Sequence, residues 1–91
     1  RVGTIRRAAN RYLTGLEDME LEETWRGLRP CTPDGLPLLG RSAKWENLIV
    51  ATGHAMLGLS LAPVSGEIVA RLADDEETGF DLAALRPERF G

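Results

Sequence analysis

The sequence predicts an α+β fold, or a slice of an α/β protein, with the element order helix, strand, turn, strand, glycine turn, helix. Two stretches of helical periodicity lie near residues 5–13 and 61–72. Between them, apolar residues alternate or run together for a few positions at a time, as they do in short strands. Proline and glycine interrupt this central stretch repeatedly, which keeps its strands short.

Composition excludes several classes of protein. The 91 residues are 43% hydrophobic and 27% charged, which is typical of a globular domain rather than a disordered chain or a coiled coil. The net charge of −3, with basic residues spread along the chain, does not favour a nucleic-acid partner. A single cysteine and a single histidine exclude an internal disulfide and a Cys/His zinc site, and we expect no metal.

The chain is expected to be part of something longer. It opens at Arg1 without an initiator methionine and enters a helical pattern at once, so we expect a C-terminal fragment, with a processed mature chain as the alternative. The longest apolar stretches, Leu48–Ala51 and Met56–Val64, are far shorter than the ~20 residues that cross a bilayer, so no transmembrane segment is expected.

The first element is an amphipathic helix. Its apolar residues recur at helical spacing, Thr4 is a candidate N-cap, and Gly15 is a candidate stop. The apolar positions are Ile5, Ala8, Ala9, Tyr12 and Leu13. Arg6, Arg7 and Arg11 lie opposite them, and solvation is favoured over a binding role for these arginines.

The second element is a predicted strand, Leu21 to Arg29. Alternation places Trp25, Gly27 and Arg29 on one face. An arginine beside a small residue suits bidentate recognition of a carboxylate. The alternative is a surface ion pair between Arg29 and Glu23.

The middle of the chain predicts turns and two more strands. Pro30 ends the first strand or places it at an edge, and Thr32–Gly35 (Thr-Pro-Asp-Gly) is typical of a type I turn. Leu36–Leu39 is a short extended run, followed by a polar loop. The continuous apolar run Leu48–Thr52 predicts a strand that is buried on both faces, as in a parallel sheet.

A long helix follows the glycine turn Gly53–Gly58. Its core positions are Leu61, Val64, Ile68 and Leu72, with Pro63 near the start. The acidic run Asp74–Glu77 is unfavourable at a helix C-terminus, so the helix should end near Ala73 and leave these acids solvated. Asp81 is a candidate cap for one last turn before Pro87.

A strand that turns through glycine into a helix N-terminus offers free N–H groups and a positive dipole end to a ligand. The alternative is an ordinary connection, because no G-x-G-x-x-G pattern or P-loop lysine is present. His54 in this turn could act as a base or a hydrogen-bond donor, or be a residue with no chemical role. Ser60 and Ser65 show no triad pattern, and Cys31 is expected to be a spectator.

Two long motifs resemble a known family. Residues 25–40 resemble the W-x-G-L-R-P-x-T-P-D-G-x-P-x-[IL]-G stretch of FAD-dependent D-amino acid dehydrogenases and glycine oxidases. Residues 47–63 resemble the same family's N-L-[FWI]-x-A-T-G-H-G-M-L-G-[LW]-[ST]-x-A-P segment, and residues 81–90 resemble its tail. Ala55 departs from the family's usual glycine, which would cost ~1 kcal/mol if the position needs a positive φ.

The resemblance implies the C-terminal slice of a two-domain FAD-binding α/β oxidoreductase: a helix, antiparallel substrate-sheet strands, and the final strand and helix of the flavin domain. Residues 1–45 would end the substrate domain and residues 46–91 the FAD domain. The family's dinucleotide fingerprint is absent from this stretch, so FAD is expected in the parent protein rather than in this chain alone.

The resemblance also implies site residues. Arg29 matches the arginine that pairs with the substrate carboxylate, and no residue is assigned as catalytic. The loop that meets the flavin ring corresponds to Gly53, His54, Ala55, Met56, Leu57, Gly58, Leu59 and Ser60.

The implied activity is oxidation of the CH–NH2 bond of a D-amino acid to a 2-oxo acid and ammonia. Dehydrogenase chemistry is favoured by Met56–Leu59 and Thr32–Gly35. Glycine, sarcosine and hydroxyproline enzymes share these motifs, so a glycine or sarcosine oxidase is an alternative. The implied partners are a small amino acid and the rest of the same chain. The implied location is the cytoplasm, with peripheral association with the inner membrane as an option.

A second hypothesis is a non-catalytic module that pairs with a copy of itself through exposed apolar surface and sheet edges.

Overall fold

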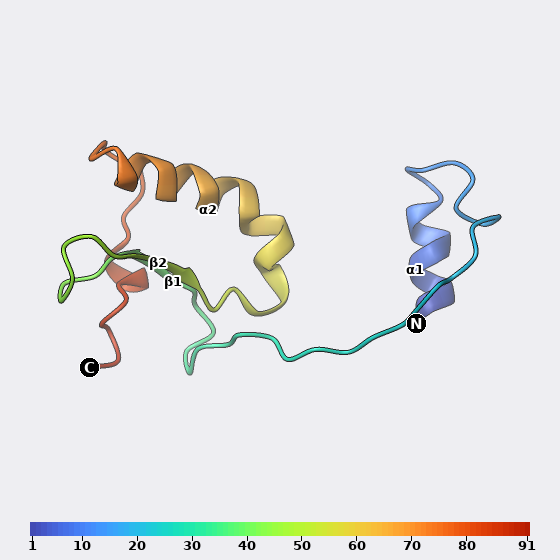
Figure 1. Cartoon of the computed structure of the whole chain (residues 1–91), viewed down its shortest axis with the longest axis horizontal. Helices are drawn as coiled ribbons and strands as arrows, with labels where there is room; N and C mark the ends of the chain where they lie inside the picture. Colours follow the sequence, from blue (N-terminus) through green and yellow to red (C-terminus); the bar gives the residue numbers. More distant parts are fainter.

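The computed structural model describes residues 1–91 and contains two helices, one hairpin and two short 3-10 turns (Figure 1). In chain order the elements are α1 (Val2–Ala9), β1 (Leu38–Arg41), β2 (Ile49–Thr52), η1 (Ala55–Leu57), α2 (Gly58–Ala73) and η2 (Ala83–Leu85). The α+β expectation is confirmed.

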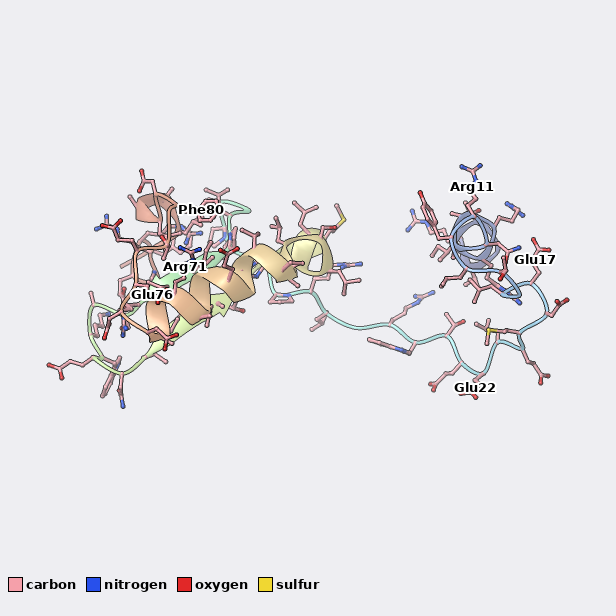
Figure 2. All side chains as sticks on the ribbon, turned by 90° about the horizontal axis from the view of Figure 1, so that it is seen from above. Arg11, Glu17, Glu22, Arg71, Glu76 and Phe80 are labelled. Atoms are coloured by element: carbon pink, nitrogen blue, oxygen red, sulfur yellow. The ribbon has the colours of Figure 1, made fainter.

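The elements fall into two separate parts. The hairpin, α2 and the C-terminal tail pack together, whereas α1 lies apart at the end of a long extended segment (Figure 1). Figure 2 shows the same separation from above, with Arg11 and Glu22 in one part and Arg71 in the other. The radius of gyration is 17.6 Å, against about 12 Å for a compact chain of this length.

Helix α1 is shorter than predicted. It spans Val2–Ala9 and continues into turns, and its N-cap is Arg1 rather than Thr4, with no side-chain cap bond. Arg6 also departs from the expected solvated face. Its Nη2 donates to the carbonyls of Leu16 at 2.8 Å and Met19 at 2.5 Å, which folds the following turns back against the helix.

The predicted strand Leu21–Arg29 is wrong. Residues 21–30 are extended and exposed, but they form no ladder with another strand. Alternation predicted an extended backbone correctly. A strand also needs a partner, and neither β1 nor β2 pairs with this segment.

The hairpin joins β1 and β2 in an antiparallel register, with Leu38 opposite Thr52 and Arg41 opposite Ile49. Strand β1 begins two residues later than predicted, because Pro37 has no N–H and the Leu36 N–H is bonded to Asp34 Oδ1 at 3.0 Å.

The expected doubly buried parallel strand is also wrong. Strand β2 pairs only with β1. Along β2, Ile49 is half-buried and Thr52 is exposed, so the strand is not buried on both faces. A continuous apolar run therefore does not by itself establish burial on two faces.

Helix α2 packs on the hairpin and supplies the small core. Ile68 of α2 is 4% exposed and Leu39 of β1 is 3% exposed. The helix ends at Ala73, as predicted. The Glu76 N–H donates to Arg71 O at 2.8 Å and the Asp75 N–H to Leu72 O at 3.3 Å, which is a Schellman motif.

The acids that follow α2 are exposed, as predicted. Asp75 stands at φ 57 in the position that glycine usually takes, and Arg41 pairs with its Oδ1 at 2.5 Å and also donates to Leu72 O. Asp81 accepts a bond from the Ala83 N–H at 2.9 Å at the start of η2, although the N-cap residue itself is Leu82.

Together η1 and α2 form one continuous helical stretch, Ala55–Ala73. By length and composition, these 19 residues are long and apolar enough to cross a membrane. The sequence expectation differed because it ended the longer apolar stretch at Val64, whereas the helix continues to Ala73 with few charged residues. Core helices of soluble proteins have the same character.

The boundary predicted between residues 45 and 46 falls within the loop of the hairpin, so the two proposed domain ends share a two-stranded sheet. The division itself remains a prediction.

Candidate functional site

The two sequence motifs meet at one point in the structure. Pro30 O accepts a hydrogen bond from the Ala55 N–H at 3.2 Å. Next to it, Cys31 pairs with His54 in an isolated antiparallel bridge. These backbone contacts place the segment that carries Arg29 directly beside the glycine loop.

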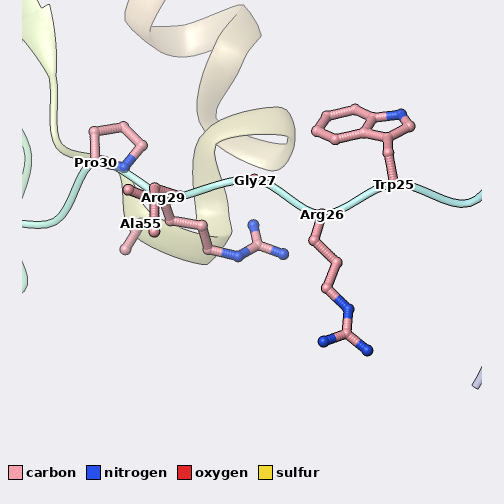
Figure 3. Close-up of a pocket in the computed structure, with 7 residues that line it drawn as sticks. Trp25, Arg26, Gly27, Arg29, Pro30 and Ala55 are labelled. Atoms are coloured by element: carbon pink, nitrogen blue, oxygen red, sulfur yellow. The ribbon is translucent and has the colours of Figure 1, made fainter.

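An open hollow of about 620 Å³ lies at this junction (Figure 3). Its lining consists of Trp25, Arg26, Gly27, Leu28, Arg29, Pro30 and Ala55. Two guanidinium groups line it and no carboxylate does, so it favours an anionic ligand. Of the predicted loop, only Ala55 reaches the hollow.

Arg29 is unpaired. The chain forms three salt bridges, and none involves Arg29, so the alternative of an ion pair with Glu23 is not realised. In Figure 3 its side chain runs from the Ala55 side toward Arg26, across the backbone from the Trp25 indole. The guanidinium is therefore available to a carboxylate.

Trp25 closes over Gly27. A Cβ added to Gly27 would lie 3.0 Å from Trp25 Cζ3, so a larger residue here would push the indole slightly away from the backbone. The prediction that Trp25, Gly27 and Arg29 share one face is correct for Trp25 and Gly27 but not for Arg29. Without a ladder, strict alternation is not imposed on Arg29.

Arg26 is a site residue that sequence reasoning missed. It lines the hollow together with Arg29, and strand alternation had assigned it to the opposite face. The available signal was two arginines three residues apart around a glycine.

The loop is fixed at its first residue. Gly53 is buried at φ +78, and a Cβ there would lie 2.8 Å from Thr32 Cγ2. A side chain is excluded at this position by both backbone conformation and space. Ala55 stands where the family usually has glycine, and it adopts a positive φ of 48. The left-handed backbone at this alanine therefore costs ~1 kcal/mol.

His54 is held from two sides. Its backbone pairs with Cys31, and its Nε2 lies 2.9 Å from Ser65 Oγ of α2. This arrangement favours the positional interpretation of His54, because the ring is held by the Ser65 hydroxyl and no carboxylate orients it as a base. Ser65, which the sequence gave no reason to select, is the partner that holds the ring.

The start of α2 fits the ring end of a flavin in two respects. Its first N–H groups have no intrahelical acceptors. The side chains around them are apolar and open, with Met56 77% and Leu59 94% exposed.

Comparison with known proteins gives consistent relatives. Glycine oxidase of Geobacillus kaustophilus is 43% identical over 79 residues, which cover 87% of this chain and 21% of the relative. D-amino acid dehydrogenase 1 of Mesorhizobium japonicum is 36% identical over 87 residues, covering 96% and 21%. Hydrogen cyanide synthase subunit HcnC of Pseudomonas aeruginosa is 37% identical over 82 residues, covering 90% and 20%. The chain therefore spans about a fifth of the length of these relatives.

The fold comparison agrees. The crystal structure of the Geobacillus kaustophilus glycine oxidase superposes with a TM-score of 0.70 at 39% identity, over 97% of this chain and 24% of that one. The sequence model of the FAD dependent oxidoreductase (DAO) family matches residues 1–72, which include Arg29 and the whole glycine loop. The chain thus belongs to the FAD dependent oxidoreductase (DAO) family.

Proposed function

We propose that this chain is the C-terminal part of a flavin-dependent oxidoreductase that oxidises the CH–NH2 bond of a small amino acid. The observation that carries the proposal is the unpaired Arg29 in a carboxylate-free hollow, hydrogen-bonded through its neighbour Pro30 to the glycine loop. An amino acid held by its carboxylate at Arg29 would present its Cα and nitrogen toward that loop.

The overall reaction removes two electrons and two protons from the Cα–N bond. The resulting imine takes up water and releases a 2-oxo acid and ammonia. FAD, when bound to the parent protein, supplies the electron acceptor for this oxidation. The residues of this chain bind and orient, and none is required as a base if a neutral amine gives up its α-hydrogen as hydride.

Arg29 contributes binding energy and orientation. A planar guanidinium donates two parallel bonds to a carboxylate, and charge-assisted bonds are worth about 1.5–3 kcal/mol. The second guanidinium, at Arg26, adds positive potential to the same hollow.

The glycine loop would hold the flavin ring. We propose Gly53–Ser60 for this role, with the N–H groups at the start of α2 stabilising negative charge at the ring. The buried Gly53 and the His54–Ser65 contact keep the loop in one conformation.

For the substrate we propose a D-amino acid, with dehydrogenase-type chemistry. A second candidate is glycine, which is favoured by the 43% identity to a glycine oxidase. Anaerobic addition of D-alanine or glycine to the yellow full-length protein separates the two, because only the true substrate bleaches the visible spectrum at low concentration. A protein that cannot be loaded with FAD would instead favour the non-catalytic, self-associating module.

Substitution of Arg29 tests the carboxylate assignment. Arg29→Ala in the full-length flavoprotein should raise KM for the amino acid about tenfold to a hundredfold, because each tenfold change corresponds to about 1.4 kcal/mol. Flavin content should stay unchanged. Arg7→Ala, an exposed arginine on the separate helix α1, is the matched control and should leave KM as it is. An unaltered KM for Arg29→Ala would remove Arg29 from the site.

The location is also a proposal. We propose a cytoplasmic enzyme, and cell fractionation checks this through the distribution of the protein between membrane pellet and supernatant.

A further inference from the structure

The C-terminal tail fastens the turn that follows Arg29. Arg89 donates to both carboxylate oxygens of Asp34, from Nε to Oδ2 at 2.9 Å and from Nη2 to Oδ1 at 2.8 Å. The same guanidinium donates to the carbonyls of Leu36 at 2.7 Å and Pro37 at 3.2 Å. With its side chain only 11% exposed, Arg89 is held far more firmly than a surface arginine.

Asp34 also bonds to other residues of the turn. Its Oδ1 also accepts the Leu36 N–H at 3.0 Å and lies 3.0 Å from Thr32 Oγ1. The Gly35 N–H donates to Thr32 O at 3.2 Å, which closes the turn. The carboxylate therefore sets the conformation of residues 32–36 with Arg89 as its anchor.

Thr32 connects the turn to the glycine loop. Its methyl carbon occupies the space that a Cβ on Gly53 would need, at 2.8 Å. The neighbouring Cys31 pairs with His54, and Pro30 O bonds to the Ala55 N–H. A continuous chain of contacts thus runs from Arg89 through Asp34 and Thr32 to the loop.

The tail has a second anchor that keeps Arg89 in place. Glu88 Oε1 accepts the Ser42 hydroxyl at 2.5 Å and the Ala43 N–H at 3.0 Å. Pro87 Cδ lies 3.5 Å from the position of a Cβ on Gly40. These contacts tie the tail to the hairpin, so Arg89 reaches Asp34 from a fixed base.

From these contacts we infer that Arg89 is a positioning residue: acting through Asp34, it fixes the distance between Arg29 and the Gly53–Ala55 loop. The inference rests on the proposed function, since it assigns Arg29 and the loop to one site. Arg89 itself lies outside the lining of the hollow and touches neither substrate nor cofactor.

Two readouts in the full-length flavoprotein test the inference. Arg89→Ala and Asp34→Asn should each raise KM for the amino acid about tenfold and change kcat less than threefold. The double variant should be no worse than either single one, because the two groups act as a unit. Arg89→Lys keeps the charge but loses the two parallel bonds of the guanidinium to Asp34, so its KM should lie between those of wild type and Arg89→Ala.

The second readout does not depend on activity. Hydrogen exchange at the Ala55 amide reports directly on the bond to Pro30 O, and it should become faster in Arg89→Ala. Arg86→Ala is the matched control, because the Arg86 side chain bonds only to Ala83 O and should leave Ala55 exchange unchanged.

The outcomes separate the two proposals. Unchanged Ala55 exchange in both Arg89→Ala and the milder Arg89→Lys, or a fall in kcat and melting temperature without a change in KM, would overturn the positioning role. Faster Ala55 exchange in a protein that oxidises no amino acid would support the positioning role and overturn the proposed function instead.

Discussion

At the scale of single residues, two glycines with nearly the same backbone angle behave differently. Gly53 at φ +78 would bring a Cβ to 2.8 Å from Thr32 Cγ2, whereas Gly35 at φ +76 has nothing within 4 Å. The first position combines a conformational restriction with a steric one, and the second has the conformational restriction alone.

Gly53→Ala should therefore lower the free energy of unfolding of the full-length protein by about 2–4 kcal/mol, since overpacking adds to the left-handed cost. Gly35→Ala should cost only about 1 kcal/mol. Denaturant unfolding of both variants measures the difference. Equal losses would show that Thr32 moves aside freely and that the contact does not restrain the loop.

Asp34 gives a pH prediction. Hydrogen bonds from the Arg89 side chain hold the pKa of Asp34 well below its ordinary value of 3.8. The unfolded chain takes up this proton near pH 4 and the folded chain does not, so the stabilisation by Asp34 is complete at neutral pH and declines as the pH falls below about 4.

The free energies of unfolding of wild type and Asp34→Asn should be measured at pH 7 and pH 3. Wild type should be the more stable protein at pH 7, and the difference between the two should be smaller at pH 3. Asp18→Asn, which removes a carboxylate that forms no salt bridge, should show no such narrowing. A gap that persists unchanged to pH 3 would contradict the prediction.

Only some residues of the candidate site could be predicted from the sequence. Arg29 was selected through its match to the family motif, because the residue pattern alone also fitted a surface ion pair with Glu23. Arg89 could not be selected, because its partner Asp34 lies 55 residues away and local rules assign that aspartate to its own turn. Ser65 was missed for the same reason: its bond to His54 exists only after the loop has folded back on α2.

At the scale of elements, the end of α2 is a clear case in which local rules succeed. The acidic run marked the stop, and the Schellman bonds confirm it. Asp75 nevertheless occupies the left-handed position at φ 57 and forms an ion pair in which its side chain is 85% exposed.

Asp75→Gly should raise the free energy of unfolding by up to about 1 kcal/mol. Relief of the left-handed backbone is worth about 1 kcal/mol, and an exposed ion pair contributes only about 0–1 kcal/mol. Asp75→Ala keeps the strain and loses the pair, so it should be the less stable of the two. Thermal melting of the two variants decides the order, and the reverse order would show that the bond to Arg41 outweighs the strain.

The two strand errors have one cause. Both predictions rested on local properties of the sequence. Alternation over Leu21–Arg29 indicates an extended backbone, and the apolar run Leu48–Thr52 indicates residues that can be buried. Which strand pairs with which is decided by residues far apart in the chain. The hairpin formed because β1 and β2 are joined by a short polar loop, and the first segment had no such neighbour.

At the scale of the whole molecule, the chain is more extended than its length requires. Only four of the 91 residues are buried, and the α1 part has no packing partner (Figure 1). The core is confined to the contact between α2 and the hairpin.

Limited trypsin digestion of the 91-residue chain should therefore cut first in residues 1–30, after Arg7, Arg11 and Arg26, where backbone is exposed. Cleavage after Arg41 should be much slower, because this residue belongs to β1 and its side chain is bonded to α2. Mass spectrometry of the early fragments checks the order, and an early cut after Arg41 would show that the hairpin opens as readily as residues 1–30.

The unpaired backbone of residues 21–30 bears on the affinity of Arg29. Fixing one residue's backbone costs about 1–2 kcal/mol of conformational entropy, so ordering even two or three residues around Arg29 cancels the 1.5–3 kcal/mol that a charge-assisted bond returns. A carboxylate should bind tightly only where neighbouring chain has already immobilised the segment. Affinity at this arginine is thus conferred by preorganisation, and a rigidifying strand laid alongside residues 21–30 would strengthen binding without adding a single contact to the ligand.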